Sequence, residues 1–168
     1  LSGEDANATF ESITLTGGRT TANGEAGGAI LSVDADVTLT NSTVSGNSTA
    51  GILAYGGGIY AATATVTNST VSGNSTAGEG AGGGGVIAGT ATLTNSTVSG
   101  NGTAGSEASG GGIFTSESLT LINSIVLGND SAQTESNEFG GRVPTVTNSI
   151  TSGDATEIFA LTQANGAA

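Results

Sequence analysis

The fold is decided by the stretch Leu39-Thr-Asn-Ser-Thr-Val-Ser-Gly-Asn47, which returns almost unchanged further along the chain. Close copies begin at Val66 and Leu93, and looser copies begin at Leu121 and Val146. The first Asn of successive copies is residue 41, 68, 95, 123 or 148, which gives steps of 27, 27, 28 and 25 residues. Repeats of roughly 20 to 50 residues are typical of stacked architectures, because one unit buries its apolar face only against its neighbours.

Each repeat has the composition of short β-strands. Thr and apolar residues alternate, as in Thr65-Val-Thr67 and Thr92-Leu-Thr94, and Gly or Asn interrupts the pattern every few residues. A propeller blade needs about 40 residues, whereas three short parallel strands fit one repeat. We therefore predict an all-β fold, a parallel β-helix (β-solenoid) of about six coils of roughly 27 residues.

We expect residues 1–168 to form a single β-helix domain. Residues 1–9 are the N-terminal lead-in, and residues 10–154 form the coils, with a degenerate first copy at 10–18. Residues 155–168 are a C-terminal tail or partial cap, in which the candidate covering residues are Ile158, Phe159 and Leu161.

Equivalent residues of successive coils should stack about 4.8 Å apart. Three apolar columns result, and we expect each to line one of three walls. They are Leu39, Val66, Leu93, Leu121 and Val146; Ile30, Ile59, Val86 and Ile113; and Val44, Val71, Val98 and Val126.

Two Asn columns recur in the same way. The first should occupy a turn, where Asn tolerates left-handed backbone and its amide can bond to the next Asn of the stack. It comprises Asn41, Asn68, Asn95, Asn123 and Asn148. The second column is the candidate for N-glycosylation, because its members lie in Asn-x-Ser/Thr sequences and are expected to point outward. It comprises Asn47, Asn74, Asn101 and Asn129.

A second landmark precedes most copies of the nonapeptide. It reads Gly27-Gly-Ala-Ile30, Gly56-Gly-Gly-Ile59, Gly83-Gly-Gly-Val86 and Gly110-Gly-Gly-Ile113. Its recurrence in register indicates tight corners between strands. Followed by Asn-Ser-Thr-Val-Ser-Gly-Asn, these tetrapeptides resemble the repeats of polymorphic outer-membrane proteins and related bacterial surface proteins. That resemblance implies a right-handed, pectate-lyase-like parallel β-helix with a cell-surface, adhesive or structural role, although carbohydrate lyases and hydrolases share the fold.

Composition excludes several classes of function. The formal net charge of −12 makes a nucleic-acid partner improbable. The chain has no Cys, His, Lys, Met or Trp, so disulfides, Cys/His zinc sites and imidazole or lysine catalysis are excluded. No apolar run is long enough to span a membrane. An acidic chain rich in Thr, Ser, Asn and Gly favours an extracellular or cell-surface location.

Candidate catalytic residues are sparse. A polysaccharide lyase or hydrolase needs clustered carboxylates, and the nearest to a stacked pair are Glu79 and Glu107, which lie in variable loops. Asp34 and Asp36 lie in a two-residue excess of their coil and are the candidate calcium ligands. Arg19 and Arg142 are about four coils apart. We therefore expect no enzyme activity and no cofactor or metal, with calcium at Asp34 and Asp36 as the alternative that stays open.

The Thr residues on either side of the inward Leu or Val point outward and predict a flat two-file array. Its members are Thr38, Thr40, Thr65, Thr67, Thr92, Thr94, Thr145 and Thr147, and the coil reading Thr120-Leu-Ile122 breaks it. Ice-binding β-solenoids use such arrays, but Thr is also an ordinary exposed strand residue.

The sequence thus favours a non-catalytic extracellular structural or adhesive module. The expected partners are other copies of the chain, cell-surface components or glycans. Because a β-helix exposes unpaired strand edges at both ends, identical chains can stack end to end into a surface filament. Two alternatives stay open, namely an ice-binding protein that uses the Thr files and a polysaccharide-binding or polysaccharide-cleaving β-helix.

Overall fold

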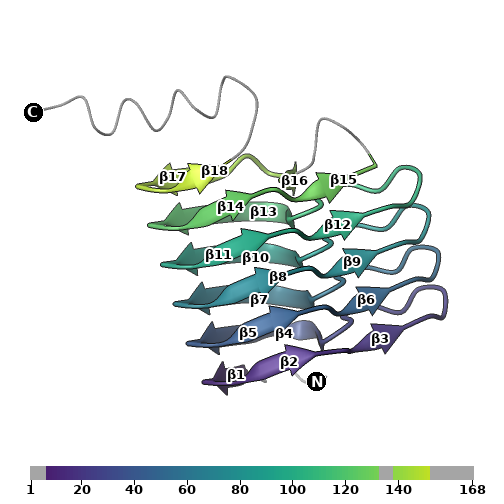
Figure 1. Cartoon of the computed structure of the whole chain (residues 1–168), viewed down its shortest axis with the longest axis horizontal. Coiled ribbons are helices and arrows are strands. Elements are labelled where there is room, and N and C mark those ends of the chain that lie inside the picture. Colours follow the sequence, from purple (N-terminus) through teal and green to yellow (C-terminus); the bar gives the residue numbers. More distant parts are fainter. Residues whose placement is uncertain (1–6, 133–137, 152–168) are drawn as a thin grey trace, which may run out of the picture.

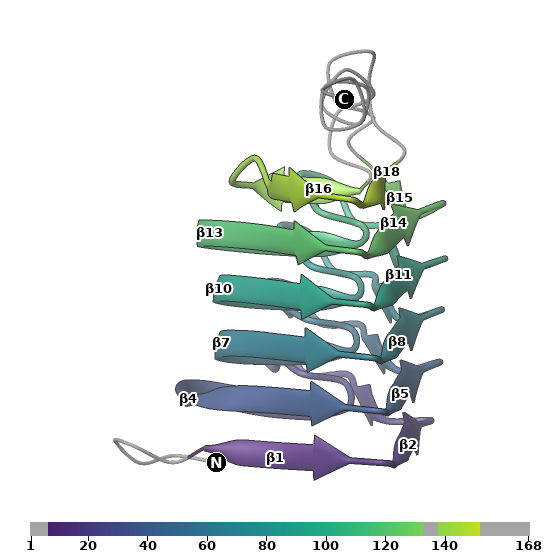
Figure 2. The ribbon, with the colours of Figure 1, turned by 90° about the vertical axis from the view of Figure 1, so that its left-hand side faces the viewer.

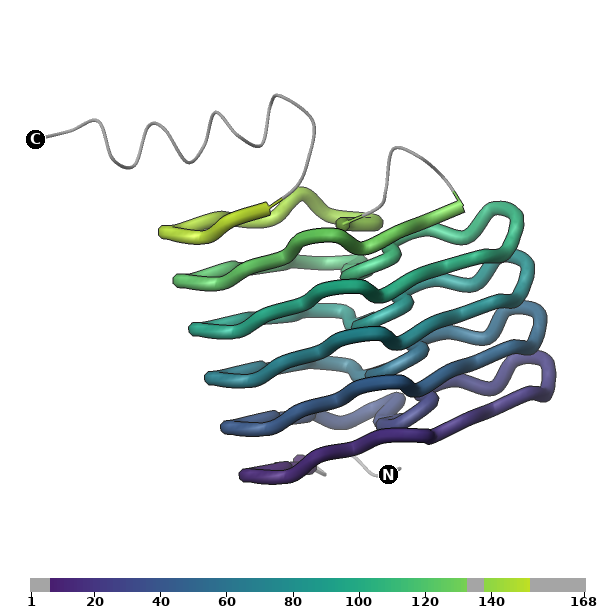
Figure 3. The backbone as a smooth tube through the Cα atoms, viewed as in Figure 1, coloured from purple at the N-terminus to yellow at the C-terminus, as the bar shows by residue number. Residues whose placement is uncertain are grey.

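The computed structural model describes residues 7–132 and 138–151, which form three parallel sheets wound into a solenoid (Figures 1 and 3). Sheet A contains β1 (Ala8–Glu11), β4 (Ile30–Thr40), β7 (Ile59–Thr67), β10 (Val86–Thr94), β13 (Ile113–Ile122), β16 (Phe139–Gly141) and β17 (Thr145–Thr147). Sheet B contains β2 (Thr14–Thr16), β5 (Thr43–Ser45), β8 (Thr70–Ser72), β11 (Thr97–Ser99), β14 (Ile125–Leu127) and β18 (Ile150–Thr151). Sheet C contains β3 (Arg19–Thr20), β6 (Ser48–Thr49), β9 (Ser75–Thr76), β12 (Gly102–Thr103) and β15 (Asp130–Ser131).

Six coils follow one another along the axis, and each strand pairs only with its equivalents in adjacent coils (Figure 2). Coil 1 comprises β1 to β3, and coils 2 to 5 each contribute the next three strands. Coil 6 comprises β16, β17 and β18, and both β16 and β17 pair with β13. The predicted stacking of Leu39, Val66 and Leu93 is confirmed by their register, and Leu121 and Val146 continue the column.

The prediction that each apolar column lines its own wall is wrong. The column of Ile59 and the column of Val66 both lie on sheet A, seven residues apart on one strand. Strict alternation would point them to opposite faces, but the pattern changes phase at Ala62 and Thr63, which both face outward. The same break occurs at Gly89 and Thr90 in β10. Both columns therefore reach the core from a single wall.

The third wall, sheet C, is lined by hydroxyl side chains in place of large apolar ones. Thr49, Thr76 and Thr103 face inward and are at most 4% exposed, and Ser131 continues the column. The apolar core lies between sheets A and B, where Leu39, Val44, Val66, Val71 and their equivalents pack together. The interior is thus apolar on two sides and polar on the third.

Two kinds of corner turn the chain from wall to wall. Between sheets A and B, the Asn residues 41, 68, 95, 123 and 148 have φ values of 48 to 52°, and Ser12 has the equivalent conformation in coil 1. Between sheets B and C, a Gly takes the left-handed role, as at Gly46 and Gly73. The predicted left-handed backbone of the first Asn column is confirmed.

The Gly-rich segments lie in the loops that return the chain from sheet C to sheet A. A Cβ atom on Gly84 would lie 2.5 Å from the carbonyl oxygens of both Gly102 and Gly111. Only glycine permits this close stacking of backbones, as predicted for tight corners. The lead-in residues 1–6, the tail 155–168 and its candidate covering residues Ile158, Phe159 and Leu161 lie outside the described residues.

Candidate functional site

The second Asn column forms a continuous hydrogen-bonded ladder inside the corner between sheets B and C. The backbone N–H and the side-chain Nδ2 of Asn47 both donate to Oδ1 of Asn74, at 3.0 and 2.9 Å. Asn74 bonds in the same way to Asn101, and Asn101 to Asn129. Each Nδ2 also donates to a carbonyl of the preceding coil, as from Asn74 to Val44 at 3.0 Å. The ladder therefore ties coils 1 to 5 together.

Glu138 terminates this ladder at coil 6. Nδ2 and the backbone N–H of Asn129 donate to Oε2 of Glu138, and the backbone N–H of Gly128 donates to Oε1 at 2.9 Å. One N–H of each Asn side chain points toward this end, so the amide of Asn129 closes the ladder as a donor that needs an acceptor beyond it. Glu138 is 5% exposed, and its carboxylate supplies that acceptor. The sequence prediction did not identify this residue.

The prediction that the side chains of the second Asn column point outward, where they could be glycosylated, is therefore wrong. Asn47, Asn74 and Asn101 are 1% exposed and Asn129 is 5% exposed. Because Gly46 already supplies the left-handed residue of the corner, the Asn that follows turns inward. An amide that is buried and hydrogen-bonded on both sides has no room for a sugar in the folded chain.

The first Asn column lies on the outside. Nδ2 of Asn68 donates to Oδ1 of Asn41 at 3.3 Å, and Nδ2 of Asn95 donates to Oδ1 of Asn68 at 3.1 Å. All members are exposed. The predicted bonding between neighbouring amides is thus present for Asn41, Asn68 and Asn95, in a solvent-facing position.

A column of Ser side chains, which the sequence prediction missed, secures the same corner from within. The backbone N–H of Ser42 donates to Oγ of Ser69 at 3.0 Å, and Ser69 Oγ donates to the carbonyl of Thr67 at 2.7 Å. The pattern runs through the corner from coil 1 to coil 6, and its Ser members are Ser42, Ser69, Ser96, Ser124 and Ser149. The signal was present, because Ser follows the first Asn in every copy.

The outer face of sheet A carries the Thr array, here named the Thr wall. One file contains a Thr in every coil, paired in register, and consists of Thr9, Thr38, Thr65, Thr92, Thr120 and Thr145. The second file contains Glu11, Thr40, Thr67, Thr94, Ile122 and Thr147. All these side chains are partly or fully exposed. The predicted outward orientation of the eight Thr residues is therefore found.

A third file extends the wall beyond the predicted two. It contains Asp36, Thr63, Thr90 and Ser118. Thr90 Oγ1 donates to Glu117 at 3.2 Å, and Ser118 Oγ donates to Thr90 Oγ1 at 3.3 Å. The phase break in the strands produces this file, because it turns Thr63 and Thr90 outward.

The acidic and basic candidates do not converge on one site. Asp34 and Asp36 are exposed and lie where β4 holds two more residues than β7, as expected from the coil length. Glu79 and Glu107 are exposed in the loops before β10 and β13. Arg19 lies in coil 1, whereas Arg142 lies in coil 6, where its Nε donates to the Ser116 carbonyl at 3.2 Å. Within residues 7–132 and 138–151, no three acidic side chains are grouped to hold a metal ion.

The stacked parallel sheets and in-register ladders define a parallel β-solenoid. The family model of the right-handed β-helix region matches residues 4–166. The chain therefore belongs to the right-handed β-helix family. Neither a curated protein nor a solved structure shows significant similarity to it. In the described part of the chain, no helix is long and apolar enough to cross a membrane.

Proposed function

We propose that the chain is a non-catalytic extracellular structural or adhesive module and that the Thr wall is its contact surface. The observation that carries the proposal is the file of six Thr residues, one in each coil from Thr9 to Thr145. Neighbouring strands of a sheet are about 4.8 Å apart, so the file repeats one chemical group at a fixed spacing. A local reaction centre needs no such repetition, whereas contact with an extended surface benefits from it.

The interior supports this role by holding the wall rigid. The hydrogen-bonded ladder from Asn47 to Asn129 and the Ser column from Ser42 to Ser149 fix the register at two corners of each central coil. A file of side chains that are held in place loses little conformational entropy on binding. The module therefore presents a preorganised surface.

The chemistry of the wall favours a hydroxylated, repetitive partner. Each Thr hydroxyl can donate one hydrogen bond and accept others, and no Lys or Arg lies in the three files. Polysaccharide chains at a cell surface offer hydroxyl groups at a regular spacing. Binding one of them would be adhesion without cleavage.

Pull-down on insoluble polysaccharides tests this proposal. The double variant Thr65→Val, Thr92→Val removes two wall hydroxyls and keeps β-branched side chains of similar shape. The matched control is Thr70→Val, Thr97→Val, which changes the paired outward residues of sheet B in the same two coils. We expect weaker retention of the wall variant only. Equal retention of both variants, or release of soluble sugar with or without calcium, would contradict the proposal.

Ice binding is the second candidate, and the spacing of the same Thr files favours it. Thr67→Tyr would raise a bulky group from the plane of the wall, and Thr70→Tyr on sheet B is the control. Thermal hysteresis that is lost in the first variant and kept in the second would support this candidate. No thermal hysteresis in the unmodified protein would eliminate it.

The polarity of the ladders distinguishes the two ends of the described solenoid. Every central coil donates hydrogen bonds to Ser and Asn acceptors of the following coil, whereas coil 1 has Ile13 and Gly18 at those positions. End-to-end stacking of identical chains into a surface filament stays part of the proposal, because the outermost strands of a β-helix have unpaired edges. Analytical ultracentrifugation across a wide concentration range tests it: we expect concentration-dependent polymers, and particles of one size at every concentration would contradict the filament.

A further inference from the structure

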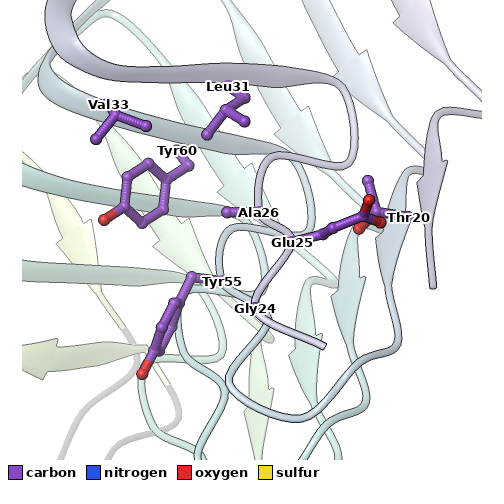
Figure 4. A pocket seen from close by; sticks show the side chains of 8 residues that line it. All are labelled: Thr20, Gly24, Glu25, Ala26, Leu31, Val33, Tyr55 and Tyr60. Carbon is purple, nitrogen blue, oxygen red and sulfur yellow. The ribbon is translucent and has the colours of Figure 1, made fainter. Parts of the chain in front are cut away.

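A pocket of about 490 Å³ opens beside coil 2, where the chain departs from its repeat (Figure 4). β4 holds two additional residues between Ser32 and Asp36, and Val33 lies in this insertion. Tyr55 pairs with Gly82, and Gly82 pairs with Ser109, so a large ring stands where the following coils have small residues. Departures from a regular pattern are the places where function is expected.

The pocket is mainly apolar and aromatic. Both tyrosines of the chain line it, with ring centroids 6.4 Å apart and ring planes tilted by 42°. Leu31 and Val33 also line it and are 44% and 51% exposed. Exposed apolar side chains gathered in a hollow of this size are the usual lining of a small-molecule site.

The charge of the pocket is negative. Glu25 is its acidic lining residue, and no Arg lines it. The carboxylate of Glu25 accepts a hydrogen bond from the backbone N–H of Ala22 at 3.2 Å, which orients it at the rim. Figure 4 shows Glu25 and Thr20 on the side of the view opposite Leu31, Val33 and Tyr60. With a formal net charge of −12, the chain attracts cations and repels anions.

We propose that this pocket binds a small quaternary ammonium ion. Such an ion carries a positive charge on a surface of methyl groups, so it suits an apolar lining with one carboxylate better than a strongly hydrated cation does. The faces of tyrosine rings attract a cation within about 6 Å of their centroids, and quaternary ammonium groups are common ligands of aromatic pockets. The pocket shares no residue with the three files of the Thr wall, although Leu31, Val33 and Tyr60 come from strands of the same sheet, so its test uses variants of other residues.

Tyrosine fluorescence gives a direct readout, because the chain has no Trp and both tyrosines line the pocket. The purified chain is titrated with choline chloride at constant ionic strength, with sodium chloride as the salt control. The neutral analogue 3,3-dimethylbutan-1-ol has the same shape without the charge. We expect a saturable change with choline and binding that is weaker by about two- to fivefold for the alcohol.

Matched variants separate the contributions of the Glu25 charge and of the Tyr60 ring from the effect of changing the net charge of the chain. Glu25→Gln should weaken choline binding by about two- to fivefold, whereas Glu107→Gln, an equal charge change in a distant loop, should not. Tyr60→Leu should weaken binding and Tyr60→Phe should retain it, as measured by the NMR signal of the choline methyl groups. Equal affinity for choline and the alcohol, equal effects of the two Glu variants, or no saturable signal would overturn the proposal.

Discussion

Asn68 and Asn74 lie in one copy of the nonapeptide and flank the same strand, β8, yet Asn68 is exposed and Asn74 is 1% exposed. Asn68 has a φ of 49° and serves the backbone of its corner. Asn74 follows Gly73, which takes the left-handed conformation instead, and its amide is free to bond within the stack. The difference shows that the residue type alone does not decide its role, because the neighbouring residue determines which conformation it must adopt.

Replacing Asn74, the buried residue of the pair, should have the largest effect on the free energy of unfolding. Asn74→Ala removes the acceptor of both the backbone N–H and Nδ2 of Asn47 and the donor to the Val44 carbonyl. Buried polar groups without partners cost about 1 to 3 kcal/mol each. We expect the free energy of unfolding in urea to fall by about 3 kcal/mol or more. A loss below about 1 kcal/mol would mean that the ladder contributes little.

Replacing Asn68, the exposed residue of the pair, should lower the free energy of unfolding by less and for a different reason. Asn68→Ala places a Cβ-bearing residue without a local amide in left-handed backbone, which costs about 1 kcal/mol. Asn68→Gly should recover most of this stability, because glycine tolerates the conformation. The measurement is again urea unfolding. Equal losses for the Ala and Gly variants would show that the amide contacts, and not the backbone, determine the role of Asn68.

The inward Thr column of sheet C allows a buried polar group without a hydrogen-bond partner to be compared with the paired amide of Asn74. Thr76 is 0% exposed and Asn74, two residues earlier, is 1% exposed, but Oγ1 of Thr76 has no hydrogen-bond partner among the residues that the structure describes. Thr76→Val keeps the shape and removes the unpaired hydroxyl, so stability should stay unchanged or rise by up to about 1 kcal/mol. Thermal unfolding checks this change. A clear destabilisation would indicate that water bridges the hydroxyl to another buried group.

Much of the fold follows from the nonapeptide itself. Its alternation predicts strands, its period predicts the coil, and the equal spacing of Leu39, Val66 and Leu93 predicts their column. The assignment of walls failed because a change of phase within β7 makes Ile59 and Val66 face the same side, although they are seven positions apart and strict alternation would place them on opposite faces. In the sequence alone, a change of phase within one strand cannot be distinguished from a corner between two strands.

The candidate sites were predictable to different degrees. The outward Thr files follow from alternation around a buried residue, so eight of their members were found from sequence alone. Glu138 was not found, because it lies outside the nonapeptide, at the position that Gly85 and Gly112 occupy in the preceding coils. The pocket with Tyr55 and Tyr60 was not found either, since its lining comes from coils that are adjacent only after stacking.

By itself, the sequence determined the period, the strand type and the stacking of like residues, because these depend on local pattern and on the burial of one apolar face. The tertiary structure decided which of two identical amides lies inside and which polar groups find partners. Those outcomes depend on distances between coils that no single repeat contains.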